Sequence, residues 1–90
     1  MSVRNVTIHL SPERLRMLVD LIGDEVGAHR MTAQNMPRTS ASADAARKAG
    51  RAHLDLLKHV SPDAYTKAVE FHGRPATWHN GDRARGAWSR

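Results

Sequence analysis

Two groups of residues in this 90-residue chain could do chemistry: six histidines, and arginines and tryptophans gathered near the C-terminus. Imidazole nitrogens can bind a metal ion, but the spacing of the histidines does not bring them together. His53 and His59 fall on different faces of one predicted helix, and the other four histidines fall in different predicted elements. We therefore expect no metal ion and no cofactor. The alternative that stays open is a zinc site assembled by the fold.

The C-terminal segment, residues 73–90, combines arginine with both tryptophans of the chain. Cationic side chains that neutralise phosphates, together with rings that stack on bases, are typical of segments that bind nucleic acid. The residues with this chemistry are Arg74, Trp78, Arg83, Arg85, Trp88 and Arg90. Two alternatives stay open: Trp78 packs back over the helices and only Trp88 is free, or Trp88 meets a partner protein.

Composition narrows the class of protein. The formal net charge of +5 and the sequence pI near 10.8 favour polyanionic partners such as nucleic acid. The absence of cysteine excludes disulfides and thiolate metal sites. The chain has no apolar run of signal-peptide type and none of the ~20 residues needed to cross a bilayer, so we expect a cytoplasmic protein without membrane contact.

The motifs of common enzyme classes are also missing from the sequence. There is no glycine-rich phosphate loop, no nucleophile elbow, and no pair of acids beside a histidine. We therefore expect that the protein is not an enzyme.

The N-terminal segment has the pattern of one short strand. From Asn5 to Leu10, polar side chains alternate with apolar ones, and this period of two is typical of a half-buried strand. A single strand leaves its N–H and C=O groups unpaired, so it needs a partner. The most available partner is the same strand of a second copy, which predicts a homodimer around a two-stranded ribbon. The only internal candidate is the segment around Ala76 to Trp78.

Capping signals predict two main helices and a short third one. The sequence Ser11-Pro12-Glu13 begins the first helix, which we expect to end between Ile22 and His29 because two glycines weaken it by up to ~1 kcal/mol each. A serine-rich start predicts the second helix, which runs to about Val60. The third covers residues 62–72 and ends at Gly73.

The expected fold is mainly α: one N-terminal strand, two main helices and a short third helix, with the strand pairing across a homodimer. Residues 1–72 would form this domain and residues 73–90 a basic tail. Met17 and Leu21 widen the apolar face of the first helix, as is usual for a helix with two neighbours. Its solvent side carries Asp20, Asp24 and Glu25. Small residues early in the second helix would let another backbone approach closely.

The run Val6-Thr7-Ile8-His9-Leu10-Ser11-Pro12-Glu13, followed by two predicted helices, resembles the ribbon-helix-helix family of transcriptional regulators over residues 3–58. In that family, two paired strands enter the major groove of DNA and the start of the second helix holds a phosphate. The resemblance implies DNA contacts by Asn5, Thr7, His9, Arg38, Ser40 and Ser42. The connection between the helices is longer than the family's tight turn. The alternative is that the polar strand residues form only a solvated face.

Two hypotheses for function follow. The first is a homodimeric DNA-binding regulator whose strand contacts the major groove and whose basic tail contacts phosphates. The second is a small non-enzymatic helical interaction protein, of a kind that phages encode, which binds a host or partner protein through its wide apolar helix face or its tail. An antitoxin would combine the two.

Overall fold

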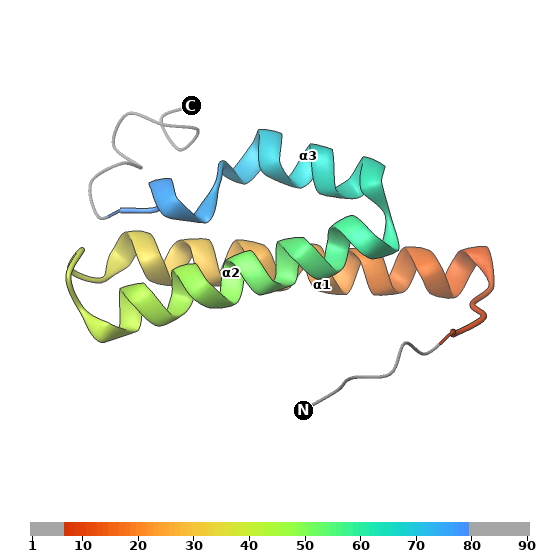
Figure 1. Cartoon of the computed structure of the whole chain (residues 1–90), viewed down its shortest axis with the longest axis horizontal. Helices are drawn as coiled ribbons and strands as arrows, with labels where there is room; N and C mark the ends of the chain where they lie inside the picture. Colours follow the sequence, from red (N-terminus) through yellow and green to blue (C-terminus); the bar gives the residue numbers. More distant parts are fainter. Residues whose placement is uncertain (1–6, 80–90) are drawn as a thin grey trace.

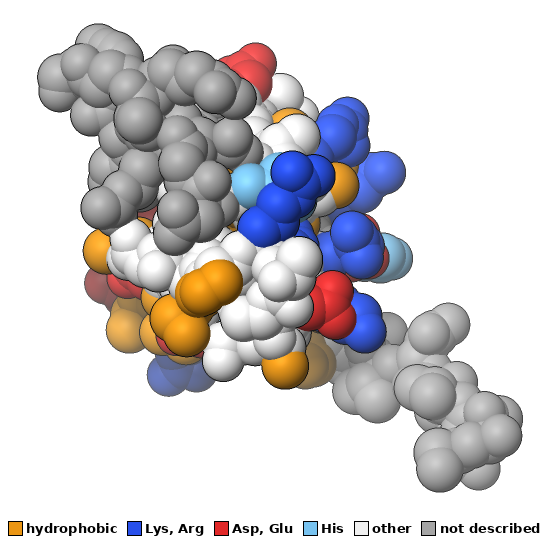
Figure 2. Space-filling view, turned by 90° about the vertical axis from the view of Figure 1, so that its left-hand side faces the viewer, with side chains coloured by type: hydrophobic (Ala, Val, Ile, Leu, Met, Phe, Trp, Pro, Cys, Tyr) orange, Lys and Arg blue, Asp and Glu red, His pale blue; other side chains and the backbone are white. Residues whose placement is uncertain are grey.

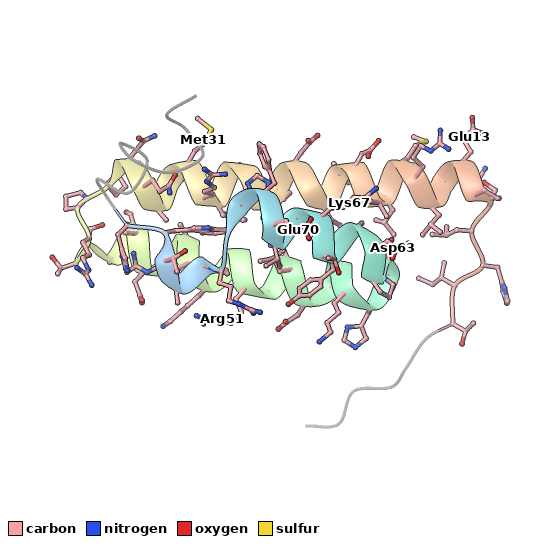
Figure 3. All side chains as sticks on the ribbon, turned by 90° about the horizontal axis from the view of Figure 1, so that it is seen from above. Glu13, Met31, Arg51, Asp63, Lys67 and Glu70 are labelled. Atoms are coloured by element: carbon pink, nitrogen blue, oxygen red, sulfur yellow. The ribbon has the colours of Figure 1, made fainter. Side chains whose placement is uncertain are left out.

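The computed structural model describes residues 7–79, which form three α-helices and one short 3₁₀ helix. The helices are α1 (Pro12–Asn35), α2 (Ala41–Val60) and α3 (Pro62–His72), and the 3₁₀ helix is η1 (Pro75–Thr77). Helices α1 and α2 lie antiparallel, and α3 turns back along them (Figure 1). Seen from above, α3 lies over the pair (Figure 3). No helix within residues 7–79 is long and apolar enough to cross a membrane.

Each α-helix begins at a serine that caps its first turn. The hydroxyl of Ser11 accepts a hydrogen bond from the backbone N–H of Arg14 at 3.2 Å. Ser40 does the same for Ala43 at 3.1 Å, and Ser61 caps α3 in the same way. Pro12 occupies the first turn of α1, where its missing N–H costs nothing. The predicted helix starts are confirmed.

Helix α1 is longer than the sequence predicted, since it runs through both glycines to Asn35. The reason is burial: Ile22, Val26, Arg30 and Ala33 continue one buried stripe along the helix. Burial of each larger apolar side chain stabilises the helix by about 1.5–3 kcal/mol, whereas each glycine costs it up to ~1 kcal/mol. The burial therefore outweighs the cost of the glycines. The helix stops before Met36, its C-cap residue, whose extended backbone (φ −100°, ψ 155°) is the conformation favoured before Pro37. The predicted long connection is therefore a short one.

The prediction of an N-terminal strand is wrong for the described residues. Thr7 to Leu10 have no regular structure and are exposed, and Asn5 and Val6 lie outside the described range. The internal candidate, Ala76 to Trp78, forms part of a 3₁₀ turn and its C-cap. Without a neighbouring ladder within residues 7–79, alternation of side chains alone does not satisfy the backbone. Residues 7–79 therefore contain no strand from which a ribbon could be built, whereas the mainly α class and the limits of α3 are confirmed.

The hydrophobic core packs around Trp78, whose side chain is 1% exposed. Its ring lies against Gly50 of α2, and a buried cluster of Val26, Ala46 and Leu54 surrounds the same region. At Gly50, α2 thus accommodates an indole ring, while the small residues Ala43 and Ala46 of the same helix are buried. The indole Nε1 donates a hydrogen bond to the carbonyl of His72 at 2.8 Å.

Arg47 joins three segments of the chain. From α2, its guanidinium donates to the carbonyl of Trp78 at 3.2 Å and to the carbonyl of Arg38 at 3.1 Å. Arg38 lies in the short connection between α1 and α2, and Trp78 follows η1. This side chain therefore holds both loops at the same end of the helical layer.

Candidate functional site

A shallow, open depression lies between α1 and α3 and is called here the α1/α3 groove. One part has a volume of about 530 Å³, and a second part of about 480 Å³ shares four residues with it. The shared residues are Gly23, Asp24, Phe71 and His72. The groove therefore continues along α1 from Val19 to Met31.

The groove is open because of its small residues. A Cβ placed on Gly23 would meet no atom within 4 Å, so the surface there is empty. On the opposite wall, Ala64 and Ala68 of α3 present only methyl groups. Lys67 extends from the same helix toward α1 (Figure 3). Small residues on both helices thus leave space for a molecule that lies between them.

Two large apolar side chains, Phe71 and Met31, line this opening and remain exposed. Phe71 of α3 is 66% exposed, and Met31 of α1 is 51% exposed. Met17 and Leu21, further along α1, are 65% and 62% exposed. The second apolar face of α1 that the sequence predicted is present, but within residues 7–79 it has no second helix packed over it. Large apolar side chains that stay exposed beside a groove, as Phe71 and Met31 do, are typical of an interaction surface.

The charged groups of the groove are mainly acidic on its α1 side. Asp20 and Asp24 are one helical turn apart and both line the groove. Within the described residues neither carboxylate forms an ion pair. Figure 2, a view toward the end with the α1–α2 connection, shows most Lys and Arg side chains on its right-hand side and a group of hydrophobic side chains at its lower left. The groove thus offers apolar surface with negative charge beside it.

Arg30 supports the α3 side of the groove from beneath. It is 4% exposed, and its Nη1 donates to the carbonyl of Phe71 at 3.3 Å and lies 3.1 Å from Nδ1 of His72. Its guanidinium lies 5.7 Å from the centroid of the Phe71 ring. Burial lowers the pKa of Arg30, and burial followed by the charge of Arg30 lowers the pKa of His72. The neutral imidazole can accept the Arg30 hydrogen bond through Nδ1.

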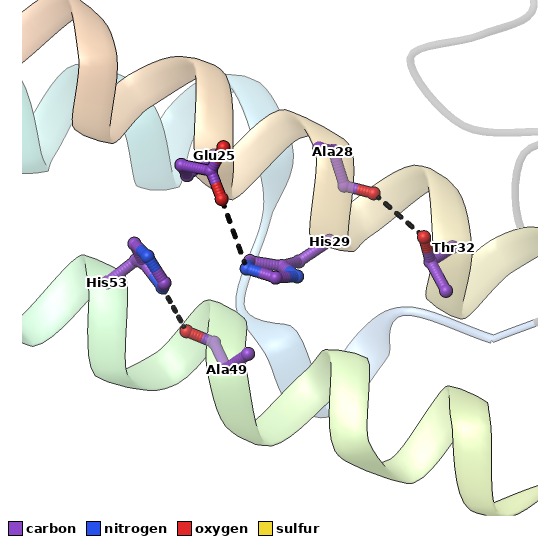
Figure 4. Close-up of polar contacts among 6 residues, drawn as sticks. All are labelled: Glu25, Ala28, His29, Thr32, Ala49 and His53. Carbon is purple, nitrogen blue, oxygen red and sulfur yellow. Dashed lines mark hydrogen bonds and ion pairs between the residues drawn. The ribbon is translucent and has the colours of Figure 1, made fainter.

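A second candidate site lies on the other side of α1, where Glu25, His29 and His53 meet (Figure 4). One possible ligand atom from each residue lies within 4.8 Å of the others. The sequence did not predict this cluster because α1 was expected to end before or at His29. The signal that could have found it is the spacing of Glu25 and His29, four residues apart on one helix.

The residues predicted to contact DNA do not form one surface. Thr7 and His9 are exposed in the irregular segment before α1, and Asn5 lies outside the described residues. Ser40 is occupied as the N-cap of α2, and Ser42 is exposed in the first turn of that helix. Arg38 is exposed and its carbonyl accepts a bond from Arg47.

The predicted contact residues of the tail also lie in different surroundings where the structure describes them. Arg74 is exposed before η1, whereas Trp78 is buried against α2, which is the packing alternative raised from the sequence. A buried ring cannot stack on a nucleic acid base. The remaining predicted positions, Arg83, Arg85, Trp88 and Arg90, lie outside the described residues.

No protein-family model, curated protein or solved structure matches this chain.

Proposed function

We propose that this protein is a non-enzymatic interaction module that binds an amphipathic helix of a partner protein in the α1/α3 groove. The observation that carries the proposal is the exposure of Phe71, at 66%, beside the empty surface over Gly23. Covering a side chain of this size gains about 1.5–3 kcal/mol. A groove between two helices that offers several such residues is suited to the apolar face of a third helix.

The charge of the groove defines the chemistry of that partner helix. Asp20 and Asp24 are one turn apart, so lysine or arginine residues one turn apart on the partner could pair with them. The partner is therefore an amphipathic helix with apolar anchors and a cationic edge on the side of α1, away from Lys67 on the α3 side. Complementary charge of this kind orients the helix and raises its association rate.

The partner can be tested with two synthetic helical peptides and the ¹⁵N-labelled full-length chain. The peptides share their apolar residues, and one carries lysine where the other carries glutamate. The lysine peptide should shift the backbone amide resonances of Gly23, Gly27 and Phe71, and its affinity should fall as salt is added. The glutamate peptide should bind more weakly by roughly tenfold or more, as expected for like charges facing each other.

Matched variants distinguish binding in the α1/α3 groove from nonspecific binding to exposed apolar side chains. Phe71→Ser and the pair Asp20→Asn/Asp24→Asn should weaken binding of the lysine peptide by roughly tenfold or more. Leu56→Ser should leave it unchanged, because Leu56 is 50% exposed on α2 and lies outside the groove. Equal binding of both peptides, or equal effects of Phe71→Ser and Leu56→Ser, contradicts the proposal.

Two rival partners are outcomes of the same test. If sedimentation shows a dimer at micromolar concentration that Phe71→Ser dissociates, a second copy fills the groove and the proposal is wrong. If duplex DNA binds with a steep salt dependence and the groove resonances do not move, the DNA hypothesis from the sequence is favoured instead. DNA binding would then have to use elements other than a strand in residues 7–79.

A further inference from the structure

The cluster of Glu25, His29 and His53 spans the interface of α1 and α2. Glu25 and His29 are four residues apart and therefore share one face of α1 (Figure 4). Their closest atoms, Glu25 Oε1 and His29 Nε2, are 3.8 Å apart. His53 approaches from α2, and its ring centroid is 4.9 Å from that of His29. Two helices thus direct a carboxylate and two imidazoles to one point.

The hydrogen bond of His53 determines its tautomer. Nδ1 lies 2.8 Å from the carbonyl oxygen of Ala49. A carbonyl only accepts, so Nδ1 carries the hydrogen and Nε2 keeps a lone pair. Metal-bound histidines use such a bond to orient the ring. His59 makes the same bond to Asp55, also at 2.8 Å, but is exposed and outside the cluster. It is therefore a matched control for His53.

The Nε2 atom of His29 is the independent observation that points to a ligand. This atom is buried, and within the described part of the chain it has no hydrogen-bond partner. A buried polar nitrogen without a partner is destabilising, and native proteins satisfy the great majority of such atoms. An ion held between the nitrogen and Glu25 would remove that cost.

We propose that Glu25, His29 and His53 bind one divalent transition-metal ion of the Zn²⁺ class and thereby join α1 to α2. Two imidazoles and one carboxylate are a known Zn²⁺ donor set that leaves a fourth position for water. Ligand atoms around a tetrahedral Zn²⁺ are about 3.4 Å apart, given bonds of about 2.0–2.1 Å. The present spread of up to 4.8 Å therefore closes by small side-chain rotations, most easily at exposed Glu25.

The test uses the full-length chain, dialysed against a chelator, and Zn²⁺ alone as the probe. Isothermal titration should show one Zn²⁺ per chain, and Zn²⁺ should raise the midpoint of thermal unfolding because it binds only the folded arrangement. Co²⁺ should give the intense visible absorption of a four-coordinate site. The variants Glu25→Gln and His53→Gln should lower Zn²⁺ affinity by about tenfold or more, the loss seen even for outer-shell changes.

His59→Gln supplies the control, since it removes a histidine with the same backbone bond from the same helix. It should leave Zn²⁺ affinity and the thermal shift unchanged. Glu25 is exposed, so Glu25→Gln keeps the test decisive if a histidine variant fails to fold. If the wild-type chain does not bind Zn²⁺ in a one-to-one ratio, the proposal is wrong. Equal affinity in the wild type, Glu25→Gln and His53→Gln also overturns it.

Discussion

The indole ring of Trp78 lies directly against the backbone of Gly50. A Cβ placed on Gly50 would overlap Cζ3 and Cη2 of the ring, so no other residue type fits at this position without movement. The ring is 1% exposed, and its Nε1 is bonded to the carbonyl of His72. The segment after α3 is thus part of the fold as far as Trp78, because α2 leaves space for it.

This contact predicts that Gly50→Ala destabilises the protein. The added methyl group must displace a ring that is held on several sides, and overpacking of this kind costs about 1–3 kcal/mol. Urea unfolding followed by circular dichroism measures the change. Gly23→Ala is the control: its Cβ meets nothing within 4 Å, so alanine should stabilise the helix by up to ~1 kcal/mol. Similar effects of the two substitutions would contradict the Gly50–Trp78 contact.

Removal of the Trp78 ring should lower the free energy of unfolding more than Gly50→Ala does. Trp78→Ala leaves a cavity beside Gly50 and should cost about 3–5 kcal/mol, a large share of the stability of a small domain. In a Trp88→Phe background, Trp78 is the only tryptophan and should show the blue-shifted emission of a buried indole. Red-shifted emission in the folded state would show that the ring is exposed and would contradict its packing against Gly50.

The two serines at the start of α2 have separable roles. Ser40 accepts the N–H of Ala43, so Ser40→Ala should cost about 1 kcal/mol of unfolding free energy. Ser42 is exposed within the first turn, and Ser42→Ala should change stability by less than about 0.5 kcal/mol. Denaturant unfolding of both variants checks the assignment. An equal loss in both would mean that Ser40 is not the cap.

A fall in pH should lower the free energy of unfolding because of His72. Burial and then the charge of Arg30 lower its pKa, so the unfolded imidazole takes up a proton near the usual pKa of about 6.5 while the folded one does not. The unfolded state then binds more protons, so the free energy of unfolding decreases as the pH falls below about 6.5. Asp24 and Lys67 also line the groove beside this histidine.

His72→Asn isolates this contribution, because the asparagine carbonyl can replace Nδ1 as an acceptor for Arg30. The variant should lose less stability than the wild type as the pH falls below about 6.5. Thermal unfolding across that range measures the difference. Parallel pH profiles for the two proteins would show that His72 is not the group responsible.

The sequence by itself determined where the helices begin and where α3 ends. Ser11, Ser40 and Ser61 each bond a backbone N–H three residues away, and Gly73 adopts a positive φ of 77° directly after α3. These are local interactions, complete within one turn of the chain, so residue type and order are enough to predict them.

Only the tertiary structure decided the features that depend on a distant neighbour. Helix α1 continues past Gly27 because Arg30 and Ala33 are buried against other elements, which no local signal records. Trp78 lies in the core because Gly50, 28 residues earlier in the sequence, is adjacent to it in space and leaves room for the ring. His29 and His53 meet for the same reason. The alternating N-terminal segment shows the converse: a strand needs a ladder, and residues 7–79 provide none.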